Sequence, residues 1–295
     1  MRQTLFPYAV IAACTVGLLL GLEAFLRVAG YQAQERYGPD PVLGWTLRPA
    51  NDVNAAGVRD RRYLVHKADD VYRIAVLGDG YTEAMDLPVT ETWWRRLAPR
   101  LEQCGFQPGR KIEALNFAVA GYSTAQQYVM LETRAMRYRP DLVLLQFAAD
   151  DVRENSFALA ARKDRPFFML EPSGGLRFDE AFATAPDFRS ETAFGAELLR
   201  RAADRSRLLQ LVSRAQAAPA SAFRPDERLW DEAWRITGAL ILKAAGFSAR
   251  NGARFMVVSI PPERRIAELG VTAVQLAPGT SHATAAELIA KALCP

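Results

Sequence analysis

From Tyr72 onward, short apolar runs alternate with segments of helical periodicity. The apolar runs are 72–77, 112–119, 141–148, 253–260 and 273–277, and the helical segments are 91–102, 125–136, 193–214, 227–250 and 283–293. Continuous apolar strands separated by helices are typical of a parallel sheet that is covered on both faces. The alternation therefore predicts a three-layer α/β/α sandwich with a mainly parallel sheet.

A run without charged residues, Leu5 to Leu22, lies ahead of this pattern and is followed by Glu23 and Arg27. As a helix, at 1.5 Å per residue, it spans about 27 Å, close to the hydrocarbon thickness of a bilayer. No good small-x-small cleavage site comes before Glu23, which favours an uncleaved anchor, although cleavage as a signal peptide stays open. The predicted parts are a membrane anchor at 1–24, a lead-in at 25–70 and a hydrolase-like domain at 71–295 with a helical or irregular insertion at about 155–225.

Charge and cysteine content exclude several classes of protein. The 37 basic and 33 acidic residues leave a net charge of +4, without a long basic block, so we predict no nucleic-acid partner. The two histidines, His66 and His282, and three cysteines, Cys14, Cys104 and Cys294, form no CxxC or HxxxH pair. The sequence therefore predicts no metal site and no cofactor. Cys104 and Cys294 are candidates for a disulfide in an extracytoplasmic domain, but sequence alone does not pair them.

The segments directly after the predicted strands are the candidates for a functional site, because sites in parallel sheets form beyond the carboxyl ends of the strands. They are GDGYTEA (78–84), AGYST (120–124), AADDVREN (148–155) and the loop before His282. Gly78 and Gly80 give a G-x-G pattern, but the third glycine of a dinucleotide fingerprint is absent.

Taken in order, these segments resemble the blocks of the SGNH/GDSL hydrolase family, and the resemblance runs from about Asp40 to the end of the sequence. The matching blocks are RIAVLGDGYTEA (73–84), LNFAVAGYSTAQQY (115–128), LVLLQFAADDVREN (142–155) and SHATAAELIA (281–290). The lead-in, with DPVLGW and NAAGVRD, is similar to that of membrane-anchored bacterial members. The resemblance implies a flavodoxin-like sandwich that faces the periplasm or cell exterior and acts on esters of carbohydrates or lipids.

In this family a serine attacks the ester carbonyl, and a histidine near the C-terminus takes its proton while an aspartate two or three residues upstream orients the ring. Here the serine position is Gly80, which carries no nucleophile, and the histidine is His282. The upstream positions, Gly279 and Thr280, are not acidic. Loss of a triad nucleophile lowers turnover about a millionfold in a well-studied case.

The family's oxyanion donors are the serine amide, a second-block glycine and a third-block asparagine. The glycine is present as Gly121, but Asp150 stands in place of the asparagine. An ionised Asp150 about 4 Å from the oxyanion opposes it by roughly 4 kcal/mol at an effective dielectric of about 20. A protonated Asp150 avoids this repulsion, and Asp79 and Asp151 nearby favour that state. We predict that Asp79, Tyr81 and Asp151 contribute to ligand binding.

Each of these residues also has a structural interpretation. Gly80 permits a tight turn, and Asp79 caps the next helix. Asp150 and Asp151 are solvated loop carboxylates, and His282 caps or packs at the start of the last helix.

Three functions are consistent with this pattern. The favoured one is a pseudoenzyme that keeps a cleft for a glycan or acyl ester. The second is an active esterase or O-acetyl hydrolase with a displaced nucleophile or an activated water, and the third is a non-catalytic scaffold or binding protein. The predicted partners are the membrane, through the N-terminal helix, and a carbohydrate or lipid ester, whereas protein partners are not indicated.

Overall fold

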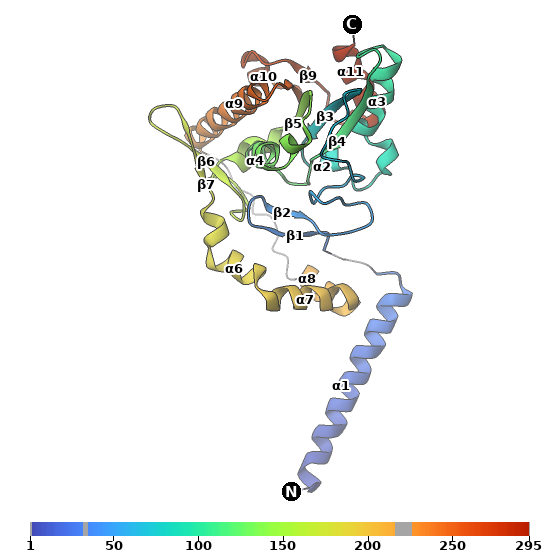
Figure 1. Ribbon diagram of the computed structural model, residues 1–295. Coiled ribbons are helices and arrows are strands. Elements are labelled where there is room, and N and C mark those ends of the chain that lie inside the picture. Colours follow the sequence, from blue (N-terminus) through green and yellow to red (C-terminus); the bar gives the residue numbers. More distant parts are fainter. Residues whose placement is uncertain (1, 32–34, 216–225, 295) are drawn as a thin grey trace. The chain divides into compact units, whose positions relative to one another are not determined.

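The computed structural model describes residues 2–31, 35–215 and 226–294 (Figure 1). The chain divides into two compact units. One consists of residues 1–38 and 186–222, and the other of residues 39–185 and 223–295. The second unit contains the sheet and all four blocks, so it carries the candidate site.

The larger unit is built on a five-stranded sheet. Its strands are β3 (Val71–Leu77), β4 (Lys111–Asn116), β5 (Leu142–Ala148), β8 (Arg254–Ile260) and β9 (Ala273–Gln275). They pair in parallel in the order β4-β3-β5-β8-β9, which in chain order is 2-1-3-4-5. This is the flavodoxin-like order of doubly wound sheets. The predicted α/β fold class is therefore confirmed.

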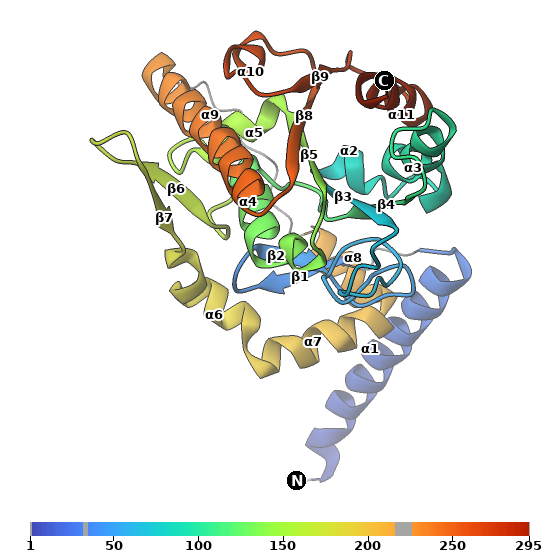
Figure 2. The ribbon, with the colours of Figure 1, turned by 45° about the horizontal axis from the view of Figure 1, so that its top comes forward.

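Helices cover both faces of this sheet, as Figure 2 shows. The helices of this unit are α2 (Gly80–Glu83), α3 (Trp93–Gln103), α4 (Thr124–Thr133), α5 (Ala149–Asn155), α9 (Glu227–Arg250), α10 (Arg264–Glu268) and α11 (His282–Leu293), with 3-10 turns η1 (Val89–Glu91), η2 (Ala135–Tyr138) and η3 (Ala181–Thr184). α3 and α11 lie on one face, where Trp93, Trp94 and Leu97 are fully buried against strand residues such as Ile74. α4 and α9 cover the other face, which completes the three layers.

Two hairpins lie outside the predicted elements. β1 (Tyr37–Asp40) pairs with β2 (Gly44–Leu47), and β6 (Phe167–Leu170) pairs with β7 (Leu176–Asp179). Both have strands of only four residues, too short for a period-2 pattern to stand out.

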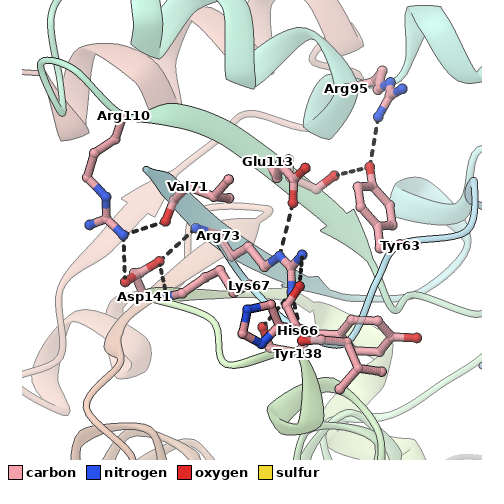
Figure 3. A network of polar contacts seen from close by, with 12 residues as sticks. Tyr63, His66, Lys67, Val71, Arg73, Arg95, Arg110, Glu113, Tyr138 and Asp141 are labelled. Atoms are coloured by element: carbon pink, nitrogen blue, oxygen red, sulfur yellow. Dashed lines mark hydrogen bonds and ion pairs between the residues drawn. The ribbon is translucent and has the colours of Figure 1, made fainter. Parts of the chain in front are cut away.

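The lead-in is fastened to the amino edge of the sheet by a network of charged groups (Figure 3). The buried guanidinium of Arg73 on β3 pairs with Glu113 at 3.0 Å and donates to the carbonyl oxygen of Val65 at 3.2 Å. Asp141, before β5, pairs with Lys67 at 2.8 Å. Residues 65–67 therefore belong structurally to the sheet domain. The predicted domain boundaries at 24/25 and 70/71 stay predictions.

Cys104 and Cys294 form a disulfide, with their Cα atoms 6.0 Å apart. Cys104 ends α3 and Cys294 ends α11, and these helices pack side by side on the same face of the sheet. The bond therefore joins the C-terminal ends of two helices that are far apart in sequence.

The smaller unit contains α1 (Arg2–Val28), α6 (Pro186–Thr192), α7 (Phe194–Arg205) and α8 (Arg207–Ala215). The predicted helix at 193–214 is thus two helices that meet at Ser206. Within α1, residues Pro7–Val28 are long and apolar enough to cross a membrane. The same property fits a membrane anchor or a signal sequence.

Candidate functional site

The candidate site lies where the order of the strands reverses. The chain passes from β3 outward to β4 and then returns to β5 on the other side of β3. Such a switch point is where ligands bind in open α/β sheets. Asp79 follows β3, and Asp150 and Asp151 follow β5. One carboxylate oxygen of each residue lies within 4.8 Å of the others, so the first and third blocks meet here.

Gly80, at the position of the family's nucleophile, is the first residue of α2 and is exposed. Its φ lies outside the left-handed region, so the backbone does not require glycine there. A Cβ at this position would lie 3.5 Å from the Cβ of Ala120, an ordinary contact. The turn between β3 and α2 therefore does not require a glycine at position 80, and a serine would fit.

Asp79 caps α2, as its structural interpretation predicted. Its Oδ1 accepts from the amide of Tyr81 at 3.0 Å, and its own amide donates to the side-chain oxygen of Gln146 at 3.1 Å. Burial, and secondarily the charge of Asp150, raise the pKa of Asp79 to about 6. This carboxyl thus titrates just below neutral pH.

Asp150 and Asp151 are in a helix, α5, rather than in the predicted loop. The apolar-to-polar change after β5 indicated a loop, but the strand passes into the helix without an intervening segment. Asp150 is exposed, whereas Asp151 is buried and so is not the solvated carboxylate of the structural interpretation. Asp151 accepts from the hydroxyl of Thr124 at 3.0 Å and from the amide of Gln127 at 3.3 Å. Burial, with a further contribution from Asp79 and Asp150, raises its pKa well above the usual value.

Oxygen ligands of this kind suit hard cations such as Mg²⁺ and Ca²⁺. Asp79 and Asp151 instead lower the repulsion within this cluster by holding protons more tightly, as their raised pKa values indicate.

His282 begins α11, and its imidazole is fixed by two contacts. Its Nδ1 accepts from the backbone amide of Trp93 at 3.1 Å. The ring stacks on that of Tyr81, with centroids 4.6 Å apart and planes 17° from parallel. Burial lowers the pKa of His282, so the ring is neutral at pH 7. A neutral ring that accepts at Nδ1 carries its proton on Nε2.

This tautomer is the reverse of the one a catalytic triad uses. In a triad, Nδ1–H donates to the acid, and Nε2 accepts the proton of the nucleophile. The role of the Trp93 amide could not be predicted from the sequence, because any residue other than proline supplies a backbone amide.

Gly279 and Thr280, the positions where the family places the acid, have structural roles in the loop before His282. The hydroxyl of Tyr81 donates to the carbonyl oxygen of Thr280 at 3.0 Å. Gly279 has φ +76°, a conformation in which a side chain is strained. Tyr81 therefore links the first block to the loop before His282.

Gly121 is required by its backbone, with φ +77°. The neighbouring amide of Ala120 donates to the buried carboxylate of Glu83, which ties the second block to α2. The indole of Trp45, from the lead-in, donates to the carbonyl oxygen of Ala120 at 3.1 Å, and Arg165 donates to that of Gly121 at 3.2 Å.

Arg59 braces the first block from the lead-in. Its buried guanidinium donates to the carbonyl oxygens of Glu83, Ala84 and Leu87, after the turn that carries Gly80. Sequence reasoning noted the NAAGVRD segment only as a family feature. A charged residue in a lead-in does not reveal that it will be buried.

The four family positions are therefore brought to the same edge of the sheet. Gly80 faces Ala120, the neighbour of Gly121, while the carboxylate before Gly80 lies near that of Asp150. The residue after Gly80 stacks on His282. The catalytic and binding roles of these residues stay predictions.

A groove of about 680 Å³ lies elsewhere in the domain. It runs along α9, between α10 and the β6–β7 hairpin, and is lined by Trp234, Leu242 and Ile266 among others. None of the predicted site residues lines it.

The pKa of Asp79 gives a test of the carboxylate cluster. The raised pKa means that the folded state binds this proton more tightly than the unfolded state does, so stability falls as pH rises from about 4 to 6. Asp79→Asn keeps an oxygen for the Tyr81 amide and removes the charge. We expect it to raise the free energy of unfolding at pH 7 by about 2 kcal/mol, with little change at pH 3.5.

Urea unfolding at both pH values measures this difference, with Asp69→Asn, an exposed carboxylate in the lead-in, as the control. Equal effects of Asp79→Asn at the two pH values would contradict the raised pKa.

Comparisons with known proteins bear on the fold. No protein-family model matches the chain, and no curated protein matches it. Among solved structures, it is similar to TesA, with 14% identity over 68% of this chain and 76% of that one, and a TM-score of 0.33. A GDSL-like lipase from Bacteroides thetaiotaomicron is 11% identical over 69% and 67%, with a TM-score of 0.31. A lipase from a goat rumen metagenome is 11% identical over 75% and 97%, with a TM-score of 0.39.

These overlaps are partial, so the assignment of the fold rests on the 2-1-3-4-5 sheet and on the meeting of the four blocks at its carboxyl edge. The chain has the flavodoxin-like, three-layer α/β/α fold with a parallel sheet that the sequence predicted.

Proposed function

We propose that this protein is a membrane-anchored, catalytically impaired SGNH hydrolase-like protein that binds a carbohydrate ester and does not cleave it. The observation that carries the proposal is Gly80 at the nucleophile position, in a turn where the backbone has room for a serine. The fold therefore does not force the loss of the nucleophile.

The state of His282 supports the same conclusion. Its Nδ1 accepts from the Trp93 amide, so the ring has no acceptor left to take a proton from a hydroxyl at position 80 or from water at its Nε2. With Asp150 in place of the oxyanion donor, the three parts of the family mechanism are altered together.

The charges around the site favour a neutral, hydroxyl-rich ligand over an anionic lipid. Asp79, with a pKa of about 6, is mostly ionised at pH 7 and lies with Asp150 and Asp151 at the switch point, where its charge repels a phosphate or carboxylate group. Carboxylates accept hydrogen bonds from sugar hydroxyls, and the stacked Tyr81–His282 pair offers a flat apolar surface beside them.

The proposal also covers the position of the protein relative to the membrane. We propose that α1 is an uncleaved anchor and that residues 40–295 face the periplasm or cell exterior. The Cys104–Cys294 disulfide supports this side of the membrane, because disulfides persist in oxidising compartments.

The test combines an activity assay with a binding assay on the purified full chain. We expect hydrolysis of p-nitrophenyl acetate at the rate without enzyme and no labelling by a serine-directed phosphonate. Binding to an immobilised panel of acetylated oligosaccharides is expected to be measurable and to weaken at least roughly tenfold with Asp150→Ala, about 1.4 kcal/mol. Asp69→Ala is the control, since it removes another exposed carboxylate, at the amino end of β3, whereas the blocks meet at the carboxyl edge of the sheet.

Turnover by the unmodified protein would contradict the proposal. If Asp79→Asn abolished that turnover, Asp79 would act as the base that activates water, because its pKa of about 6 suits that role. Absence of both turnover and binding would leave the scaffold interpretation.

A further inference from the structure

α7 and α8 of the smaller unit carry their apolar side chains outward. Phe194 and Leu199 on α7 are 78% and 72% exposed. On α8, Leu209 and Val212 are also exposed, whereas the polar Gln210 is only 3% exposed. In a helix that faces water this distribution is reversed, with apolar residues inside. The exposed faces of α7 and α8 therefore suit an apolar environment.

The polar groups of these helices are used within the unit. The side-chain amide of Gln210 donates to the carbonyl oxygens of Ala203 and Asp204 near the end of α7, at 3.2 and 3.1 Å. Arg200 pairs with Glu197 along α7 at 3.2 Å. Gln210 and Arg200 therefore have hydrogen-bond or ion-pair partners within the smaller unit, while apolar side chains of the same helices are exposed.

The corner between α7 and α8 is clamped to α1 by one pair of charged residues. Glu23 accepts from the amides of Arg207 and Leu208, at 3.0 and 2.8 Å, at the start of α8. Arg27, one turn further along α1, pairs with Glu23 and donates to the carbonyl oxygen of Arg205 at the end of α7. An anion at a helix start and a cation at a helix end both match the helix dipoles.

The contacts of Glu23 and Arg27 hold the corner between α7 and α8 at a defined position along α1. Glu23 is the first charged residue after the uncharged run Leu5–Leu22, so it lies where a spanning helix would leave the hydrocarbon. Figure 2 shows α7 and α8 beside that end of α1. The exposed apolar faces therefore begin at the depth of the lipid headgroups.

The charged residues of α7 and α8 are also suited to the depth of the lipid headgroups. Residues 194–215 contain five arginines and two acidic residues. Arginine in an amphipathic helix at a membrane surface binds anionic headgroups while leucine and phenylalanine enter the acyl region. A lipid surface satisfies the apolar and the basic side chains together.

We propose that α7 and α8 lie in the membrane interface beside α1 as a second, monotopic contact with an anionic bilayer. This surface is continuous with the anchor, which favours lipid over a second copy of the chain. The proposal rests on α1 spanning the bilayer, and it is independent of what the sheet domain binds.

The test uses the full chain with Cys14→Ser, purified and reconstituted into vesicles of phosphatidylcholine and phosphatidylglycerol. Single cysteines introduced by Leu199→Cys, Leu64→Cys or Leu18→Cys carry an environment-sensitive fluorophore. Leu64 is the matched control, because it is the same residue type, 80% exposed, in the lead-in. Leu18 in α1, 74% exposed, reports on the anchor.

We expect the label at 199 to be quenched by nitroxide lipids and to be at least roughly threefold less accessible to aqueous iodide than the label at 64. The label at 18 should be quenched by lipids and not by iodide. Iodide quenching at 199 equal to that at 64 would overturn the proposal. Shielding at 199 from both quenchers would also overturn it, since a second copy would then cover the helices. Iodide quenching at 18 would instead show that the anchor itself is wrong.

Discussion

Gly80→Ser alone is expected to leave ester hydrolysis at background. The serine fits, because a Cβ at position 80 makes only an ordinary contact with Ala120. It would nevertheless lack a base, since the Nδ1 of His282 accepts from Trp93 and the ring carries its proton on Nε2. Asp150 would still oppose the charge that develops on the carbonyl oxygen.

The triple variant Gly80→Ser, Asp150→Asn, Thr280→Asp should hydrolyse p-nitrophenyl acetate roughly a hundred- to a thousandfold faster than Gly80→Ser. Asparagine restores an oxyanion donor, and an aspartate near the ring offers an acceptor for a proton on Nδ1. Thr280 is the position to change, because Gly279 has φ +76° and a side chain there would be strained.

Initial rates and phosphonate labelling measure this gain. Gly80→Ala with the same two further changes is the matched control, and it should stay at background because it restores everything except the nucleophile. If Gly80→Ser alone were as fast as the triple variant, neither the charge of Asp150 nor the tautomer of His282 would limit the reaction. The Trp93 amide, which only a proline at position 93 would remove, sets the expected ceiling.

Loss of the disulfide is expected to destabilise the larger unit strongly. Cys104 and Cys294 are 190 residues apart, and cross-linking so long a loop restricts the unfolded chain. The chain-entropy estimate for a loop of this length is about 5 kcal/mol, although measured effects are often smaller. We expect Cys104→Ser with Cys294→Ser to lower the free energy of unfolding by about 4 kcal/mol, close to a thousandfold in the folding equilibrium.

Urea unfolding of the detergent-purified chain, followed by tryptophan fluorescence, measures this loss. Cys14→Ser is the control, because Cys14 is a free cysteine in α1 and should not affect the transition. Reduction of the unmodified protein should reproduce the double variant. A change of less than about 1 kcal/mol would mean that the unfolded chain is already restricted without the bond.

The sheet was predictable because its strands are buried on both faces. An uninterrupted apolar run such as DLVLLQFA has few alternatives to a central strand, and β5 covers Leu142–Ala148 of it. The break at Ser206 was not predictable, since apolar periodicity continues across it. What separates α7 from α8 is the clamp by Glu23 and Arg27, nearly 180 residues earlier in the chain.

The positions of the candidate site residues could be predicted from the sequence, but their burial and their hydrogen-bond partners could not. The blocks located Gly80, Gly121, Asp150 and His282 because sheet topology brings their loops to one edge. The burial of Asp151 and the backbone partner of His282 depend on neighbours that no local pattern encodes. Gln146 differs from these residues, because it is the one polar residue of β5 and could be singled out in the sequence; its side-chain oxygen accepts from the amide of Asp79.

Because α11 is the last helix in the chain order, its partner α3 is covered late in assembly. β3, β4, β5 and the lead-in residues that brace them all precede position 149, so they can pack while the rest of the chain is still being made. The face that carries Trp93 and Trp94 stays without its cover until α11 arrives, together with His282 and Cys294. A chain arrested before that point therefore displays an open tryptophan-rich surface and an unpaired thiol. Proteases and chaperones that monitor unfinished proteins would recognise both features.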